Sequence, residues 1–228
     1  MNKIASLHEV TLRMEHVKIR YGSRTILKDL DWEIKNGEKW RYSVRMVPVS
    51  LPCLSLVYAD QSQSYANTLY LLIEERFGES IWDIKKRIGY VSPEMHLYYK
   101  ENVPTLNIVG SGFFDSIGLF RKCNAEQETV ALEWMKVFGI EHLKDRLFLT
   151  LSSGEQRLAL LARAFVKDPD LIILDEPLHG LDVSNKKKAA AIIEQFCDRP
   201  GKTLIYVTHY PHELPACVDK RFELVKHS

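Results

Sequence analysis

Two adjacent carboxylates, Asp175 and Glu176, directly follow the apolar run LIIL at residues 171–174. A short run of only apolar residues is typical of a strand that is buried on both faces of a parallel sheet. Such a strand brings the residues after it to its carboxyl end, the edge at which open α/β sheets bind ligands. One carboxylate there can face a metal ion while the other orients or deprotonates a water molecule. The pair predicts a metal-assisted hydrolytic site, although Asp-Glu-Pro after a strand is also a common loop.

A serine and glycine turn lies earlier in the chain, in the segment LSSGEQR at residues 151–157. Ser152, Ser153 and Gly154 precede a predicted helix in which apolar residues recur at spacings of three and four. Backbone N–H groups and hydroxyls at the start of a helix bind anions such as phosphate. The alternative is an ordinary helix cap without a ligand.

Two more signals follow the carboxylates. Gly180-Leu181-Asp182 is a predicted turn, and His209 comes directly after the β-branched run 203–207, a second predicted buried strand. Between them we expect a helix that Ser184 caps and that runs to about Cys197. A single histidine after a strand is usually structural, so His209 alone does not establish a function.

Composition limits the classes of protein. The chain has 228 residues, a net charge of +1 and 46% hydrophobic residues, as expected for a soluble globular protein with no charge signal for nucleic acid. Its four cysteines are far apart and form no CxxC pair, so we expect neither a disulfide framework nor a zinc site. No segment approaches 18 consecutive apolar residues. We therefore expect a cytoplasmic protein, for which any transport role requires a separate membrane partner.

In this order and spacing, LSSGEQR, LIILDEP and GLD resemble the signature motif, Walker B strand and D-loop of ATP-binding-cassette (ABC) ATPases. The resemblance implies an α/β fold of the P-loop NTPase type, with a RecA-like parallel sheet, an antiparallel β-subdomain and a helical subdomain at roughly 95–165. One nucleotide-binding domain would span residues 1–228. The segments SPEMHLYY and GESIWDIKKRIGYVS are similar to the molybdenum-transport or photorepair-type ATP-binding proteins, which commonly carry two cassettes in tandem.

The resemblance also implies ATP and Mg²⁺ as cofactors and a role for each motif. Asp175 would hold magnesium, Glu176 would polarise the attacking water and His209 would contact the γ-phosphate. The signature residues would close over ATP held by a second cassette, in a homo- or heterodimer; they are Ser152, Ser153, Gly154 and Glu155. Asp182 would couple the two sites, and Tyr21 would stack on adenine unless it is only a half-buried strand tyrosine. A membrane permease would be a further partner.

The phosphate-binding loop GxxxxGK[ST] of this family has no counterpart here. After Trp40 the chain reads RYSVRMVPVSLPCLSL, which contains no glycine and no lysine. Valines and prolines deny the turn its positive φ angles and remove backbone amides. As written, the segment does not cradle a phosphate. The loop at Ser92-Pro93-Glu94 is also atypical, because Pro93 lies near the position where relatives have a magnesium-binding glutamine.

A pair of compensating single-base changes explains the missing loop. With suitable codons, the bases that encode Arg41–Cys53 give LFGPNGAGKSTL when they are read from the third base. One base restored after the Trp40 codon and one removed near Cys53 return the complete motif with the length unchanged. The hypothesis is a frameshift; the alternative is a loop that has truly diverged. A second frame slip is a further hypothesis for Leu71–Phe77.

Three functions remain open on the sequence. The first is the ATPase subunit of a transporter or related machine. The second is a nucleotide-independent binding subunit that keeps the signature and pairs with an intact cassette. The third is an inactive frameshifted product. For the rest of the chain we expect a strand over Ile84–Val91, surface positions for Glu213 and Asp219, and helices over 105–149 with Val137 and Phe138 among the core residues.

Overall fold

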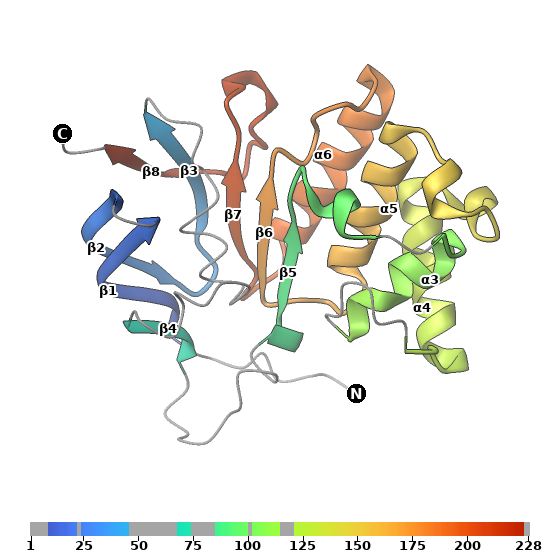
Figure 1. Cartoon of the computed structure of the whole chain (residues 1–228), viewed down its shortest axis with the longest axis horizontal. Coiled ribbons are helices and arrows are strands. Elements are labelled where there is room, and N and C mark those ends of the chain that lie inside the picture. Colours follow the sequence, from blue (N-terminus) through green and yellow to red (C-terminus); the bar gives the residue numbers. More distant parts are fainter. Residues whose placement is uncertain are drawn as a thin grey trace.

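A parallel five-stranded sheet forms the centre of the computed structural model, which describes residues 9–21, 24–45, 68–73, 85–99, 102–114 and 121–225 (Figure 1). In order of pairing its strands are β5 (Ile88–Val91), β6 (Leu171–Asp175), β7 (Thr203–Val207), β3 (Lys39–Arg45) and β8 (Lys220–Val225). Neighbouring strands are parallel throughout. Every residue of β5, β6 and β7 is buried, as expected for strands covered on both faces. The predicted α/β class is confirmed.

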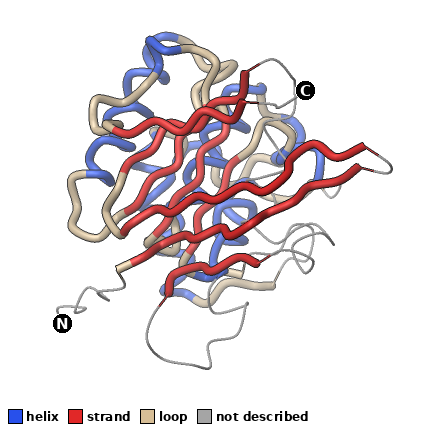
Figure 2. Tube along the Cα trace, turned by 90° about the vertical axis from the view of Figure 1, so that its left-hand side faces the viewer, coloured by secondary structure: helices blue, strands red, loops and turns tan. Residues whose placement is uncertain are grey.

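A three-stranded antiparallel sheet lies at the β8 and β3 end of the parallel sheet (Figure 1). It contains β1 (Val10–Tyr21), β2 (Arg24–Lys35) and β4 (Thr68–Ile73), in the order β2-β1-β4. Figure 2 shows β1 and β2 running side by side as a long hairpin, in agreement with the antiparallel β-subdomain that the resemblance implies. Thr68–Ile73, which overlaps the suspected segment Leu71–Phe77, pairs with β1.

Helices gather at the other end of the parallel sheet, beyond β5 (Figure 1). They are α3 (Thr105–Gly110), α4 (Ala125–Phe138), α5 (Ser153–Phe165) and α6 (Val183–Cys197). The first three pack on one another, and α5 also packs against β5. Gly89 permits that approach, because a Cβ atom there would lie 2.5 Å from the carbonyl oxygen of Ala164. No helix in the described ranges is long and apolar enough to cross a membrane.

An aromatic cluster joins the two sheets. Trp32 of β2 stacks on Phe222 of β8 with 4.4 Å between the ring centroids, and Tyr42 of β3 lies 5.8 Å from Trp32. Tyr42 is fully buried. Stacked and edge-to-face pairs at these distances stabilise a fold beyond the area they bury. The cluster therefore fixes β3, the strand that leads to the missing phosphate loop, against its neighbours.

Two expectations about strand and helix limits are corrected. β5 begins at Ile88 and not at Ile84, because residues 85 and 86 are helical. The cap of α6 is Asp182 and not Ser184: the Asp182 carboxylate accepts a hydrogen bond from the backbone N–H of Asn185 at 2.9 Å. A cap lies one residue before the first helical position, and α6 begins at Val183.

Two expectations about burial are also wrong. Val137 is 44% exposed, because the buried stripe of α4 consists of Ala131, Met135 and Phe138, and residue 137 lies off it. Glu213 is 9% exposed and not a surface residue. Its carboxylate Oε1 lies 2.6 Å from Nζ of Lys186, and this pairing permits its burial.

Candidate functional site

Asp175 and Glu176 lie at the carboxyl end of the parallel sheet, as predicted. Asp175 is the last residue of β6 and is 2% exposed. Glu176 follows in the left-handed backbone region, with φ of 46°, and its N–H donates to the carbonyl oxygen of Val207 at 3.0 Å. A glutamate rarely adopts this conformation, and such residues are enriched at functional sites. The chain therefore turns sharply where the two carboxylates meet the sheet edge.

The end of β7 holds the Glu176 carboxylate. Its Oε1 accepts a hydrogen bond from the backbone N–H of His209 at 2.8 Å, and its Oε2 accepts one from the Thr208 hydroxyl at 3.2 Å. The His209 ring points outward: its side chain is 60% exposed, and Nε2 lies 4.0 Å from Glu176 Oε1. The structure thus brings Glu176 and His209 together, and Thr208 is a contact that the motif analysis missed.

Among the described residues, the site has more negative than positive charge. Burial, and then repulsion from Glu176, raise the pKa of Asp175 to about 7. The guanidinium of Arg157 opposes this rise by attraction, but its own burial lowers the pKa of Arg157. Arg157 Nη1 donates to the carbonyl oxygen of Ser92 at 3.0 Å. Glu94 also raises the pKa of Asp175, so among the described residues three acidic groups lie near one buried guanidinium, an arrangement that suits a divalent metal ion.

The Arg157 contact was not foreseen, although the residue stands in the segment LSSGEQR. It ties the loop at Ser92-Pro93-Glu94 to the helix that follows the signature. Pro93 has no N–H to donate and no side-chain oxygen, so it cannot replace the glutamine of relatives as a metal ligand.

The signature residues begin α5 with a capping box. The backbone N–H of Glu155 donates to the Ser152 hydroxyl at 3.3 Å, and Glu155 Oε2 accepts from the Ser152 backbone N–H at 2.8 Å. The Ser152 hydroxyl also donates to Glu155 Oε2 at 2.8 Å. These bonds lower the pKa of Glu155 and keep its carboxylate ionised. Ser152 and Glu155 therefore have a capping role within the chain itself.

Gly154 faces the turn that carries the D-loop motif. A Cβ atom at Gly154 would lie 3.6 Å from the carbonyl oxygen of Gly180, which is ordinary van der Waals contact. Beside this contact is a cavity of about 350 Å³ between the signature helix, the turn and the loop at residues 92–96. The residues that line it include Pro93, His96, Ser153, Arg157, His179 and Gly180.

Asp182 acts locally as the cap of α6. Its carboxylate accepts hydrogen bonds from both the backbone N–H and the side-chain Nδ2 of Asn185, at 2.9 and 2.6 Å, and the first of these lowers its pKa. Tyr21 ends β1 and pairs with Arg24 across the hairpin; its side chain lies outside the described part of the chain, so its predicted stacking on adenine stays untested.

The segment that replaces the phosphate loop is described only up to Arg45. β3 pairs with β7, and Tyr42 of β3 and Asp175 of β6 both lie level with Val207. The chain therefore leaves β3 at the same sheet edge as the carboxylates. Residues 46–54 lie outside the described ranges. The Nε atom of Arg41 is buried without a hydrogen-bond partner among the described residues.

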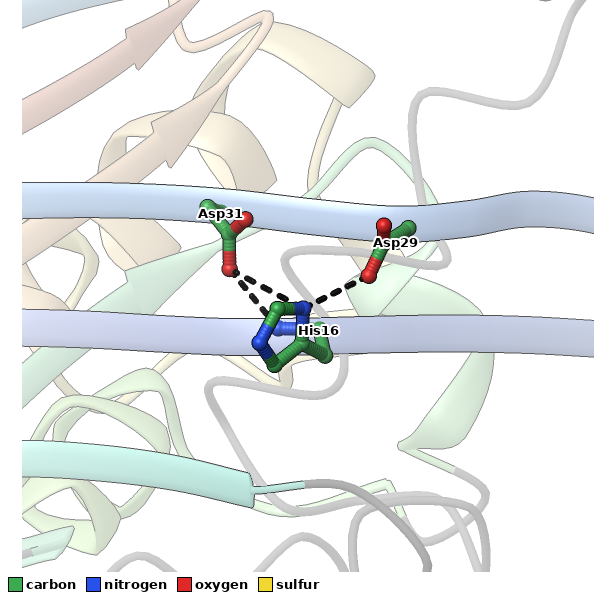
Figure 3. A group of neighbouring side chains, drawn as sticks. All are labelled: His16, Asp29 and Asp31. Atoms are coloured by element: carbon green, nitrogen blue, oxygen red, sulfur yellow. Dashed lines mark hydrogen bonds and ion pairs between the residues drawn. The ribbon is translucent and has the colours of Figure 1, made fainter.

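A second group of ionisable residues lies on the β1–β2 hairpin, at residues that none of the motifs includes (Figure 3). His16 Nδ1 lies 2.6 Å from Asp29 Oδ1, and the His16 backbone N–H donates to Asp31 Oδ1 at 2.8 Å. The contact with Asp29 raises the pKa of His16. All three side chains are more than 60% exposed. Their pattern in the sequence carries no metal motif, and their hydrogen bonds explain their arrangement.

Comparison with known proteins identifies the family. The family described as ABC transporter matches residues 56–179. The ABC transporter ATP-binding protein ModF of Escherichia coli is 40% identical over 209 residues, which are 91% of this chain and 43% of ModF. An uncharacterized ABC transporter ATP-binding protein of Schizosaccharomyces pombe is 27% identical, over 96% of this chain and 45% of its own length. The chain thus spans less than half the length of these two relatives.

Solved structures show the same fold. The dimeric, post-hydrolysis state of the ATP-binding cassette MJ0796 bound to ADP and Pi superposes with a TM-score of 0.71 at 20% identity, over 94% of each chain. CbiO1 from Clostridium perfringens, part of the transporter complex CbiONQ, gives a TM-score of 0.72 at 21% identity, over 95% of this chain and 85% of that one. The P-loop NTPase fold predicted from the motifs is confirmed.

Proposed function

This chain belongs to the ABC transporter family, and we propose that it is the ATP-binding subunit of a transporter or related machine, in which ATP binding and hydrolysis change the conformation of a partner. The observation that carries the proposal is the buried Asp175 beside Glu176 at the sheet edge, with a pKa of about 7. A carboxylate that is so strongly disfavoured as an anion is stabilised by a cation. A Mg²⁺ ion that binds together with ATP would supply this cation.

Asp175 would hold the Mg²⁺ ion, and Glu176 would orient the attacking water. The hydrogen bonds from His209 N–H and the Thr208 hydroxyl support this division, because they fix the Glu176 carboxylate at the sheet edge. The exposed ring of His209 would contact the γ-phosphate. A bound magnesium ion supplies positive charge that stabilises the phosphate oxygens during transfer.

The signature would act on a nucleotide held by a second cassette. Ser153 and Gly154 are in the first turn of α5, where N–H groups and the positive end of the helix dipole favour an anion. Asp182 would couple the two sites, and Tyr21 would stack on adenine. The second cassette would be another copy or a tandem relative. A membrane permease would be a further partner, and the chain would then lie in the cytoplasm or on the inner face of the membrane.

We propose a compensated frameshift as the origin of residues 41–54. The match to the family begins only at residue 56, after this segment. The buried Nε atom of Arg41 has no hydrogen-bond partner among the described residues, which supports the proposal, because such an arginine does not suit a strand inside a sheet. The frameshift is either natural or an error of sequencing, and sequencing of the gene across codons 38–56 separates the two. A base restored after codon 40 and one removed near codon 53 support a sequencing error. DNA that encodes RYSVRMVPVSLPC contradicts that error, and it contradicts a natural frameshift as well unless its bases read LFGPNGAGKSTL from the third base.

Nucleotide binding tests the function itself. We expect the chain as written to bind a fluorescent ATP analogue weakly or not at all. A variant in which residues 41–53 read ALFGPNGAGKSTL should bind it with Mg²⁺ and hydrolyse ATP. In that background Glu176→Gln should keep binding and lose hydrolysis, whereas Glu133→Gln, an exposed change on α4, should keep both. A restored loop that binds no nucleotide would contradict the ATPase proposal and favour a nucleotide-independent subunit.

A further inference from the structure

The hairpin of β1 and β2 contains a bulge at His16. Between the paired residues Met14–Trp32 and Val17–Leu30, two residues of β1 lie opposite one residue of β2. These four paired residues are buried, whereas the His16 side chain is 78% exposed. A bulge of two residues against one re-aims the side chains beside it. The bulge therefore sets the imidazole on the outer face of the hairpin.

Two carboxylates from β2 meet the imidazole there. Asp29 and Asp31 are two residues apart on one strand, and Figure 3 shows the His16 ring between them. Nδ1 of His16 lies 2.6 Å from Oδ1 of Asp29 and 3.9 Å from Oδ1 of Asp31. The His16 backbone N–H donates to Oδ1 of Asp31 at 2.8 Å and keeps that carboxylate beside the ring. The hydrogen bonds thus hold three metal-ligating side chains together without an ion.

The spacing of these atoms suits a metal ion. One ligand atom from each of His16, Asp29 and Asp31 lies within 4.8 Å of the other two. Two atoms that are each about 2.0–2.2 Å from a zinc ion are roughly 3–3.5 Å apart. Small side-chain rotations would therefore bring all three atoms to one ion, because the three side chains are exposed and not fixed by packing.

The chemistry of the ligand atoms indicates the kind of ion. An imidazole nitrogen with carboxylate oxygens suits Zn²⁺, Co²⁺ or Ni²⁺, whereas Mg²⁺ and Ca²⁺ prefer oxygen ligands alone. The surroundings are negative: the hydrogen bond to Asp29, and then the charges of Asp31 and Glu15, raise the pKa of His16. Negative charge at this surface attracts a cation.

We propose that His16, Asp29 and Asp31 form a binding site for a divalent transition-metal ion. Nδ1 of His16 and one oxygen of each aspartate would bind the ion, with the ring proton on Nε2 and water in the remaining positions. The ion would connect β1 to β2. The site is on the antiparallel sheet, away from the catalytic carboxylates, and its binding requires no nucleotide. It contains no cysteine, so the cysteine spacing does not predict it.

Calorimetric titration of the purified full chain with zinc chloride tests the proposal; the chain carries no histidine tag, and millimolar Mg²⁺ is present throughout. We expect one zinc site whose affinity falls at least tenfold in His16→Asn and in Asp29→Asn. Asparagine suits both positions, because His16 and Asp29 have φ of 51° and 57°, and asparagine tolerates positive φ. The backbone should therefore keep its conformation.

His142→Asn is the matched control, because His142 is another exposed histidine beside a carboxylate, Glu141. This variant should bind zinc as the unmodified chain does. An unmodified chain that binds no zinc would overturn the proposal, and so would His16→Asn with unchanged affinity. The three residues would then be only a surface group of hydrogen bonds.

Nuclear magnetic resonance locates the ion in the unmodified chain, so the proposal stays testable even where a substitution disturbs the hairpin. Paramagnetic Co²⁺, added in less than equimolar amounts, should broaden the amide signals of residues 15–17 and 29–31 before those of other residues. Broadening centred on His96 and His179 instead would place the ion elsewhere and contradict the assignment.

Discussion

Asp175 gives the sharpest prediction at the scale of single residues. Its pKa of about 7 exceeds the usual 3.8, so the folded state binds a proton more tightly than the unfolded state does. The free energy of unfolding should therefore fall between pH 4 and pH 7 on account of this residue, and the penalty should be complete above pH 7. Asp175→Asn should remove this slope and stabilise the protein at pH 8 by up to about 4 kcal/mol.

Urea denaturation from pH 5 to pH 8 measures the effect. Asp145→Asn, an exposed change with no such environment, is the matched control and should keep the slope. Millimolar Mg²⁺ at pH 8 should stabilise the unmodified chain and leave Asp175→Asn unaffected. Equal pH profiles for the unmodified chain and Asp175→Asn would contradict the charge deficit that we infer for the site.

Arg41 gives an unusual prediction, a substitution that stabilises. Its Nε atom is buried without a hydrogen-bond partner among the described residues, and an unsatisfied buried donor costs about 1–3 kcal/mol. Arg41→Ala removes the donor and should raise the midpoint of urea denaturation. Arg13→Ala on β1 is the contrast: this arginine pairs with Glu33 on the surface at 2.8 Å, and its loss should change stability by less than about 1 kcal/mol. A destabilised Arg41→Ala protein would show that the residue has a partner.

The sequence predicts the position of a residue that follows a recognisable strand. It does not predict a contact between segments that are far apart in the sequence. Asp175 and Glu176 follow an apolar run, and their position at the sheet edge comes directly from that pattern. Thr208 and Arg157 contact this site through tertiary packing that no local spacing expresses. Glu213 was placed on the surface because its partner, Lys186, lies 27 residues away in the sequence.

The start of α6 carries a prediction at the scale of elements. Asp182 caps the helix, and Ser184 lies inside its first turn. Loss of an N-cap side chain costs about 1 kcal/mol, so Asp182→Ala should lower the free energy of unfolding by that amount. Ser184→Ala should leave the free energy of unfolding unchanged or raise it slightly, because alanine has a higher helix propensity than serine. Urea denaturation measures the free energy of unfolding of both variants. A larger loss for Ser184→Ala would mean that Ser184, and not Asp182, is the N-cap.

The elements themselves were largely foreseeable, because buried strands and capped helices leave strong local patterns. β6, β7 and α5 correspond to an apolar run, a β-branched run and a 3–4 spacing after a serine cap. The errors are at the limits. β5 starts four residues later than predicted, because residues 85 and 86 are helical. Val137 was assigned to the core because one apolar residue does not define which face of a helix is buried.

At the scale of the whole molecule, the motifs predicted the architecture but not the contacts that join the two sheets. The order of LSSGEQR, LIILDEP and GLD places a helix, a strand and a turn around one sheet edge. The stacking of Trp32 on Phe222 joins the two sheets. It depends on packing between strands nearly 200 residues apart, so the spacing of residues within each strand does not predict it.

Assembly with a second cassette is the prediction for the whole molecule. In the variant with residues 41–53 restored and Glu176→Gln added, Mg-ATP should convert monomers to dimers, because in the proposed function the signature of each chain would close over the nucleotide of the other. Gly154→Asp in that background should abolish the dimer while the fold remains stable. The positive end of the helix dipole stabilises a carboxylate in the first turn of α5, so the variant should fold. The same carboxylate repels a phosphate that approaches this turn.

Light scattering after size-exclusion chromatography gives the mass of each variant with and without Mg-ATP, and urea denaturation confirms that Gly154→Asp is folded. Glu133→Gln, an exposed substitution on α4, should leave the dimer intact. Dimers of Gly154→Asp that form as readily as those of its parent would mean that the signature does not face the nucleotide. The capping box of Ser152 and Glu155 would then be the whole role of this segment, and the second cassette would bind elsewhere.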